Sequence, residues 1–190
     1  PALRAAYSDA VRAWFGGDPG ERMLLDKLPL NLVHLGFIRR IFPEAKILIA
    51  LRDPRDVCLS AYFQNFHLNT AMIQFLDIAR CARAYHDAMG LLLHFEEILG
   101  LQTLRFRYED VVGDLKGEAS RILAFLGLDW TDEITAFAEK SAKRAISTPS
   151  ARDVASGLYT RALGRHRHYA AQLAPVMDDL RPFVEALGYP

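Results

Sequence analysis

Residues 46–63, KILIALRDPRDVCLSAYF, decide the fold of this 190-residue chain. The run that follows Lys46 is apolar, rich in isoleucine and leucine and without polar alternation, which is typical of a strand covered on both faces. Asp53 is a preferred N-cap residue and Pro54 fits the first helical position, so we expect a helix from there to about Phe66. The stretch therefore predicts a buried strand that passes directly into a helix.

Outside this stretch, predicted helices alternate with further strands. Helical spacing covers 2–15, 31–42, 70–99, 117–127, 131–140 and 169–187, and strand patterns cover 23–26 and 101–109. Because strand–helix alternation is typical of βαβ units, we expect an α/β fold with a parallel sheet and helices on both of its faces. No internal repeat or long linker interrupts the chain, which predicts one domain over residues 1–190.

The composition excludes several classes of protein. Hydrophobic residues make up 51% and charged residues 24%, and the formal net charge is zero, so we expect no nucleic-acid partner. The longest apolar runs are too short to span a bilayer, and no signal peptide is visible. Neither Cys58 nor Cys81 has metal-ligand spacing, and we expect both to be reduced, buried residues of a cytoplasmic protein without a metal.

Arg52 and Ser60 are the first candidates for a binding site. Arg52 ends the predicted strand, and ligands of doubly wound sheets bind outside the carboxyl ends of the strands. The following helix directs its unpaired N–H groups to the same place, while a guanidinium can bind two phosphate oxygens at once. We therefore expect an anion site that includes the Ser60 hydroxyl. The alternative is that Arg52 pairs with Asp53, Asp56 or Glu109.

Three segments resemble sulfotransferases that use 3′-phosphoadenosine 5′-phosphosulfate (PAPS), and they occur in the same order as in that family. They are RDPRDVCLSAYF (52–63), RFRYEDVVGDLKGEASRILAFLGL (105–128) and STPSARDVASGLYTRALGRHRHY (147–169). The likeness covers roughly residues 22–190. It is closest to bacterial sulfotransferases associated with tetratricopeptide repeats, and more distant to tyrosylprotein sulfotransferases. The resemblance implies a three-layer, P-loop-like version of the expected α/β fold.

The resemblance also implies roles for individual residues. By matching position, Arg52 and Ser60 would hold the 3′-phosphate of PAPS and of its product 3′,5′-phosphoadenosine. Tyr108 would lie beside the adenine, where a flat ring with a polar tip suits a purine edge. The cationic segment around Gly164 would close over the nucleotide. Within it, Arg165 is the first candidate for a phosphate contact and Arg161 the second.

Two further residues are candidates for catalysis. Sulfuryl transfer should follow the logic of phosphoryl transfer, by in-line displacement with electrostatic stabilisation of the leaving oxygen. Lys27 follows the strand predicted over residues 23–26, and the family carries a lysine or histidine near the reacting centre, so we assign Lys27 to the leaving oxygen. The alternative is a salt bridge to Asp26 or Asp53. Ser150 matches a serine that hydrogen-bonds the sulfuryl group in the tyrosylprotein branch; the alternative is a turn residue.

The sequence also departs from the family. The serine-glycine-threonine-threonine phosphosulfate loop, its preceding strand and the acidic base of the tyrosylprotein branch are not found, and Gln64 stands where that branch has an arginine. We therefore expect the C-terminal part of a longer enzyme, with tetratricopeptide repeats a possible upstream partner. The acceptor would be a hydroxyl-bearing small molecule, a sugar or a tyrosine. A non-catalytic nucleotide-binding or interaction remnant stays open; a P-loop-like kinase is disfavoured because no Gly-x-x-x-x-Gly-Lys-Ser/Thr motif exists.

Overall fold

A computed structural model describes residues 1–67, 69–134 and 163–190 of the chain. The chain divides into two compact units. The N-terminal unit comprises Pro1–Ile47 and Ala88–Gln102, and the C-terminal unit comprises Leu48–Asp87 and Thr103–Pro190. The expectation of a single domain over residues 1–190 stays a prediction.

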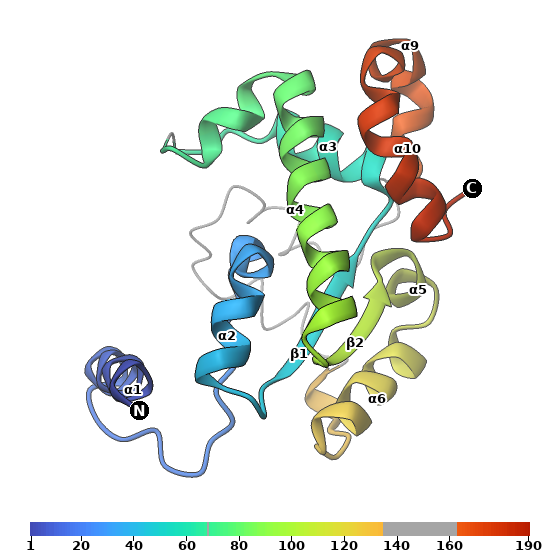
Figure 1. The fold of residues 1–190 in the computed structure, drawn as a ribbon. Helices are drawn as coiled ribbons and strands as arrows, with labels where there is room; N and C mark the ends of the chain where they lie inside the picture. Colours follow the sequence, from blue (N-terminus) through green and yellow to red (C-terminus); the bar gives the residue numbers. More distant parts are fainter. Residues whose placement is uncertain (68, 135–162) are drawn as a thin grey trace. The chain divides into compact units, whose positions relative to one another are not determined.

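Strands β1 (Lys46–Leu51) and β2 (Gln102–Arg107) form a two-stranded parallel sheet (Figure 1). Between them the chain passes through helix α3 (Pro54–Phe63), the 3₁₀ helix η2 (Met72–Leu76) and helix α4 (Ile78–Ile98). A parallel pair needs such a crossover, because a tight turn can join only antiparallel strands. The predicted α/β fold with a parallel sheet is confirmed. Helix α3 ends before Phe66.

Strand β2 is shorter than the strand predicted over residues 101–109. It ends at Arg107, and Tyr108 is the first residue of helix α5 (Tyr108–Gly113). Glu109 and Asp110 stand in the first turn of α5, where negative side chains interact favourably with the N–H groups of a helix N-terminus. The assignment of Tyr108 to a strand is therefore wrong, although the residue still lies at the carboxyl end of β2.

The strand predicted over residues 23–26 is also wrong, because these residues belong to neither a strand nor a helix. A strand needs a neighbour that pairs its N–H and C=O groups, and among the described residues the sheet consists of β1 and β2. Side chains hold the segment instead. The Tyr7 hydroxyl donates to the Asp26 carboxylate over 2.9 Å, and the Asn31 amide donates to it over 3.3 Å.

Helices of the N-terminal unit follow the sequence pattern closely. Helix α1 (Ala2–Phe15) matches the helix predicted over 2–15 and ends at Gly16, whose φ of 70° is the left-handed conformation that glycine adopts at helix ends. The helix predicted over 31–42 is present as two pieces, the 3₁₀ helix η1 (Pro29–His34) and the helix α2 (Leu35–Ile41).

Longer helical predictions are interrupted. The break between η2 and α4 falls at Asp77, whose carboxylate accepts the N–H of Arg80 over 2.9 Å. The stretch predicted as one helix over 169–187 consists of several short helices. Pro175 interrupts it, because proline lacks the N–H group that a continuous helix would use there. The remaining elements of the C-terminal unit are α6 (Leu115–Leu126), η3 (Asp132–Ile134), η4 (Arg165–Tyr169), α9 (Ala170–Leu173), η5 (Ala174–Val176) and α10 (Met177–Ala186). Of the helix predicted over 131–140, the part after residue 134 lies outside the described residues.

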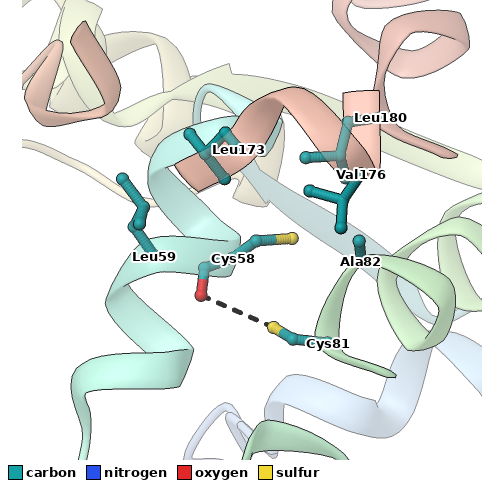
Figure 2. Close-up of a cluster of buried hydrophobic side chains, with 7 residues drawn as sticks. All are labelled: Cys58, Leu59, Cys81, Ala82, Leu173, Val176 and Leu180. Atoms are coloured by element: carbon teal, nitrogen blue, oxygen red, sulfur yellow. Dashed lines mark hydrogen bonds between the residues drawn. The ribbon is translucent and has the colours of Figure 1, made fainter. Parts of the chain in front are cut away.

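A buried cluster joins α3 to α4 and to the C-terminal helices (Figure 2). Its members are Cys58, Leu59, Cys81, Ala82, Leu173, Val176 and Leu180. The Cys81 thiol donates to the Cys58 carbonyl over 3.5 Å, and both cysteines are free and buried, as expected from the sequence. Burial of each leucine or valine side chain in the cluster contributes about 1.5–3 kcal/mol relative to exposure, so the cluster holds α3 in place. None of the described helices is both long enough and apolar enough to cross a bilayer.

Candidate functional site

The helix start after β1 forms as the sequence predicts. Asp53 is the N-cap of α3, and its carboxylate accepts the N–H of Arg55 over 2.9 Å, while Pro54 occupies the first helical position. Proline fits there because the first N–H of a helix has no partner within the helix. This local geometry turns the chain sharply after β1 and leaves Arg52 between the last strand residue and the first helical residue.

Arg52 and Tyr108 meet at the carboxyl ends of the two neighbouring strands. The guanidinium carbon of Arg52 lies 5.5 Å from the centroid of the Tyr108 ring, within the range of a cation–π contact. One guanidinium nitrogen of Arg52 is 3.9 Å from the Asp56 carboxylate, and the Arg52 side chain is 18% exposed. The sequence left open whether Arg52 pairs with a neighbouring acid, and the structure shows such a contact with Asp56. Arg52 makes this contact and the contact with the Tyr108 ring at the same time.

Ser60 lies two turns into α3 and is half-buried. It follows Asp56 by four residues, so both side chains belong to one face of the helix. Since Asp56 contacts Arg52, this face continues from the strand end along α3. That Arg52 and Ser60 bind the same phosphate stays a prediction.

Asp56 is a buried residue that the sequence argument considered only as an alternative ion-pair partner of Arg52. Its side chain is fully buried, and it accepts hydrogen bonds from two backbone N–H groups of a distant segment. Gly164 donates over 2.8 Å and His166 over 2.7 Å, and the Nδ1 atom of His166 lies 3.2 Å from the same carboxylate. The C-terminal segment is thereby attached directly to the face of α3.

Arg165 stands between these two anchored residues. The residue is exposed, and its guanidinium carbon lies 4.7 Å from the ring centroid of Phe63 and 6.0 Å from that of Tyr169. Phe63 follows Ser60 by three residues on α3, so Arg165 reaches the same end of the helix as Ser60. The structure thus brings Arg165 to α3. Arg161 and Ser150 lie outside the described residues.

Lys27 belongs to the N-terminal unit and is exposed. The strand on which its placement was argued is absent from the described residues. Its neighbour Asp26 is engaged with Tyr7 and Asn31. The catalytic assignment of Lys27 therefore stays a prediction that depends on the family resemblance alone.

A second carboxylate, Glu109, ties the two strand ends together. It accepts the backbone N–H of Asp53 over 3.1 Å and the hydroxyl of Tyr189 over 3.2 Å. Burial and the charge of Glu109 raise the pKa of Tyr189 above its ordinary value, so this hydroxyl stays a donor. Burial would by itself raise the pKa of Asp53, but the hydrogen bond from Arg55 and the charge of His166 together hold that pKa below its ordinary value.

Spacing is the signal by which Asp56 could have been found. It lies four residues after Arg52, which precedes the helix, and four before Ser60, with which it shares a helix face. Glu109 was considered only as an alternative partner of Arg52, at the end of the second predicted strand. Its two partners lie 56 and 80 residues away in the chain.

Comparisons with known proteins identify the family of the chain. A profile described as "Sulfotransferase family" matches residues 2–132 of the chain. An uncharacterized protein of Aquifex aeolicus is 27% identical over 168 residues, which is 88% of this chain. Sulfotransferase 2A6 of the mouse is 32% identical over 57% of the chain, and protein-tyrosine sulfotransferase A of Caenorhabditis elegans is 25% identical over 62%.

These relatives are much longer than the matched region. The alignments cover 22%, 39% and 30% of the Aquifex, mouse and worm proteins, respectively. The matched profile nevertheless spans more than half of this chain and includes Arg52, Ser60 and Tyr108. The chain belongs to the sulfotransferase family.

Proposed function

We propose that this domain takes part in sulfuryl transfer from PAPS to a hydroxyl group, by in-line displacement. The observation that carries the proposal is the meeting of Arg52 and Tyr108 at the ends of two parallel strands. A cation and an aromatic ring side by side at this edge suit a ligand that has both a phosphate and a purine. We take both compact units to be parts of one sulfotransferase domain, since the matched profile includes residues of each.

The 3′-phosphate is the group that Arg52 and Ser60 would bind. A guanidinium offers two parallel donors to a phosphate, and a serine hydroxyl adds a third. Asp56 lies near Arg52, but its oxygens already accept two backbone N–H groups, which disperses its negative charge. The site is thus cationic at Arg52 despite the neighbouring carboxylate. Arg165 and Arg161 would add further positive charge from the C-terminal segment, and Tyr108 would lie against the adenine.

Catalysis would depend mainly on positioning and charge. Sulfuryl transfer makes negative charge grow on the oxygen that leaves with the nucleotide phosphate. In the proposal Lys27 stabilises that oxygen and the Ser150 hydroxyl donates to the sulfuryl group, with no metal ion required. In-line displacement requires that the protein hold the donor and the acceptor in one line. In the proposal, the residues at the start of α3 help to hold the donor nucleotide in that position.

A hydroxyl acceptor follows from the family, and tyrosine is one candidate because the worm relative is named a protein-tyrosine sulfotransferase. A sugar or a small alcohol are the others. The free cysteines Cys58 and Cys81 fit a reducing compartment, so we place the reaction in the cytoplasm. The resemblance of the sequence alone supports the further proposal that tetratricopeptide repeats accompany this domain in the full-length protein.

Calorimetry with two nucleotides tests the proposal. We expect 3′,5′-phosphoadenosine to bind at least about tenfold more tightly than AMP, because a phosphate held by a guanidinium contributes well over one kcal/mol. Equal affinities would show that no 3′-phosphate site exists and would remove the proposal.

A second measurement tests the catalytic assignment. In the longer enzyme that carries the phosphosulfate loop, Lys27→Ala should lower the turnover of sulfuryl transfer to a tyrosine peptide or a sugar while the affinity for 3′,5′-phosphoadenosine stays the same. Lys116→Ala, on α6 and exposed, is the matched control and should change neither quantity. A loss of nucleotide affinity with unchanged turnover would contradict the role given to Lys27.

A further inference from the structure

Asp56 is the most buried charged residue in the described part of the chain. Its relative exposure is 1%, against 5% for Asp53. An ionised carboxylate loses the hydration that stabilises it when it is buried, so it is retained only where donors replace the lost water. The donors that surround Asp56 therefore indicate what this residue does.

Those donors come from one short segment of the chain. Oδ2 of Asp56 accepts the N–H of Gly164 over 2.8 Å, and Oδ1 accepts the N–H of His166 over 2.7 Å. The two anchored residues flank Arg165. Fixing the backbone on both sides of a residue fixes the direction in which its side chain leaves the chain. Asp56 thereby sets the place from which the Arg165 guanidinium reaches out.

The same carboxylate also contacts the strand-end arginine. One guanidinium nitrogen of Arg52 lies 3.9 Å from Oδ2, the oxygen that accepts Gly164. An ordinary helix-capping acid would contact its own first turn. That task belongs to Asp53, which accepts the N–H of Arg55. Asp56 thus contacts the Arg52 guanidinium and the two backbone N–H groups that flank Arg165, and not the N–H groups of its own helix start.

We propose that Asp56 is a positioning residue that couples Arg52 to Arg165, so that both cations converge on one phosphate of the nucleotide. This inference rests on the proposed function, since it assigns how the two arginines are held for that ligand. Asp56 itself touches no ligand and acts through the Arg52 side chain and the backbone of residues 164–166. Loss of its charge loosens the segment that carries Arg165.

The test is a double-mutant cycle measured by calorimetry. Asp56→Asn keeps the size of the side chain but replaces one acceptor oxygen with an NH₂ group, which cannot accept a backbone N–H. We expect its affinity for 3′,5′-phosphoadenosine to fall about tenfold, as for a lost hydrogen bond to a charged group. In an Arg165→Ala background the same change should cost clearly less than tenfold, because the part of the effect that passes through Arg165 is already lost and only the part through Arg52 is left.

Asp114→Asn is the matched control. Asp114 also accepts a backbone N–H, that of Gly117 over 2.8 Å, but at the start of α6. It should leave the affinity for 3′,5′-phosphoadenosine within about twofold of the unchanged protein. If Asp56→Asn costs the same with and without Arg165, Asp56 has a structural role only and the inference is overturned.

Amide hydrogen exchange keeps the inference testable even if Asp56→Asn does not fold. In the unchanged protein the N–H groups of Gly164 and His166 should exchange much more slowly than exposed amides, since both are bonded to a buried carboxylate. Fast exchange at both positions would overturn the inference. If the unchanged protein binds 3′,5′-phosphoadenosine and AMP equally, the proposed function fails; if it discriminates but the cycle is additive, only this inference fails.

Discussion

Two arginines stand at the ends of the neighbouring strands, and they are used in different ways. Arg52, directly after β1, contacts the Tyr108 ring and the Asp56 carboxylate. Arg107, the last residue of β2, donates to the backbone carbonyls of Leu187 and Gly188, and its guanidinium carbon lies 4.6 Å from the ring centroid of Tyr189.

The difference lies in the groups that the fold brings to each strand end. Helix α10 ends at Ala186, and Arg107 donates to two carbonyl groups just after that end, where a cation is also favoured by the helix dipole. Arg52 instead contacts two side chains, an aromatic ring and a carboxylate. An arginine at a strand end is therefore not by itself an anion site. The partners of such an arginine depend on the groups that the fold places around it.

The largest effect that separates the two arginines should come from Arg52→Ala. We expect it to weaken the binding of 3′,5′-phosphoadenosine by about 1.5–3 kcal/mol, the range of a hydrogen bond to a charged group. Thermal stability without nucleotide should change little. Calorimetry and a thermal melt measure the two quantities. If this variant unfolded the domain and nucleotide had no stabilising effect on the unchanged protein, Arg52 would be a structural residue like Arg107.

The reciprocal change is Arg107→Ala. We expect it to lower the free energy of unfolding by about 1–2 kcal/mol, because two carbonyl groups near the end of α10 lose their charged donor. Nucleotide affinity, measured where the variant is still folded, should stay within about twofold. If Arg107→Ala instead abolished nucleotide binding and left stability unchanged, the structural role that we give to Arg107 would be wrong.

A smaller effect is expected from Ser60→Ala. A neutral hydroxyl donor contributes about 1 kcal/mol to binding, less than the guanidinium of Arg52. The affinity for 3′,5′-phosphoadenosine should fall while that for AMP is unchanged, as measured by calorimetry. Ser120→Ala, at an exposed position of α6, is the control. Equal losses for both nucleotides would place Ser60 outside the 3′-phosphate site.

The smallest effect concerns acid stability at the start of α3. The pKa of Asp53 is held below its ordinary value in the folded protein, so its ionised form contributes stability above the pKa of the unfolded chain. This contribution should be lost as the pH falls through the lower pKa of the folded state. Thermal melts from about pH 6 downward, compared between the unchanged protein and Asp53→Asn, measure it. In the Asp53→Asn variant the melting temperature should fall less steeply towards acid pH than in the unchanged protein. An equally steep fall would contradict the lowered pKa of Asp53.

Local patterns predicted the elements that depend on few neighbours. Strand β1, the N-cap at Asp53, the proline after it and the end of α1 at Gly16 are all where the sequence indicated. The physical reason is that caps, turns and apolar runs act over a few residues of chain. The boundary errors at Tyr108 and Asp77 arose where a strand or helix pattern continued past a residue that begins a new helix.

The site needed the tertiary structure. The sequence by itself determined the chemistry available at the β1 end: a cation, a serine two turns later and an acid between them. Only the fold decided that this acid accepts N–H groups 108 and 110 residues further along the chain. The same holds for Arg107, whose carbonyl partners lie 80 and 81 residues away. A buried charge takes whichever donors the folded backbone presents, and no local pattern encodes a partner so far away in the chain.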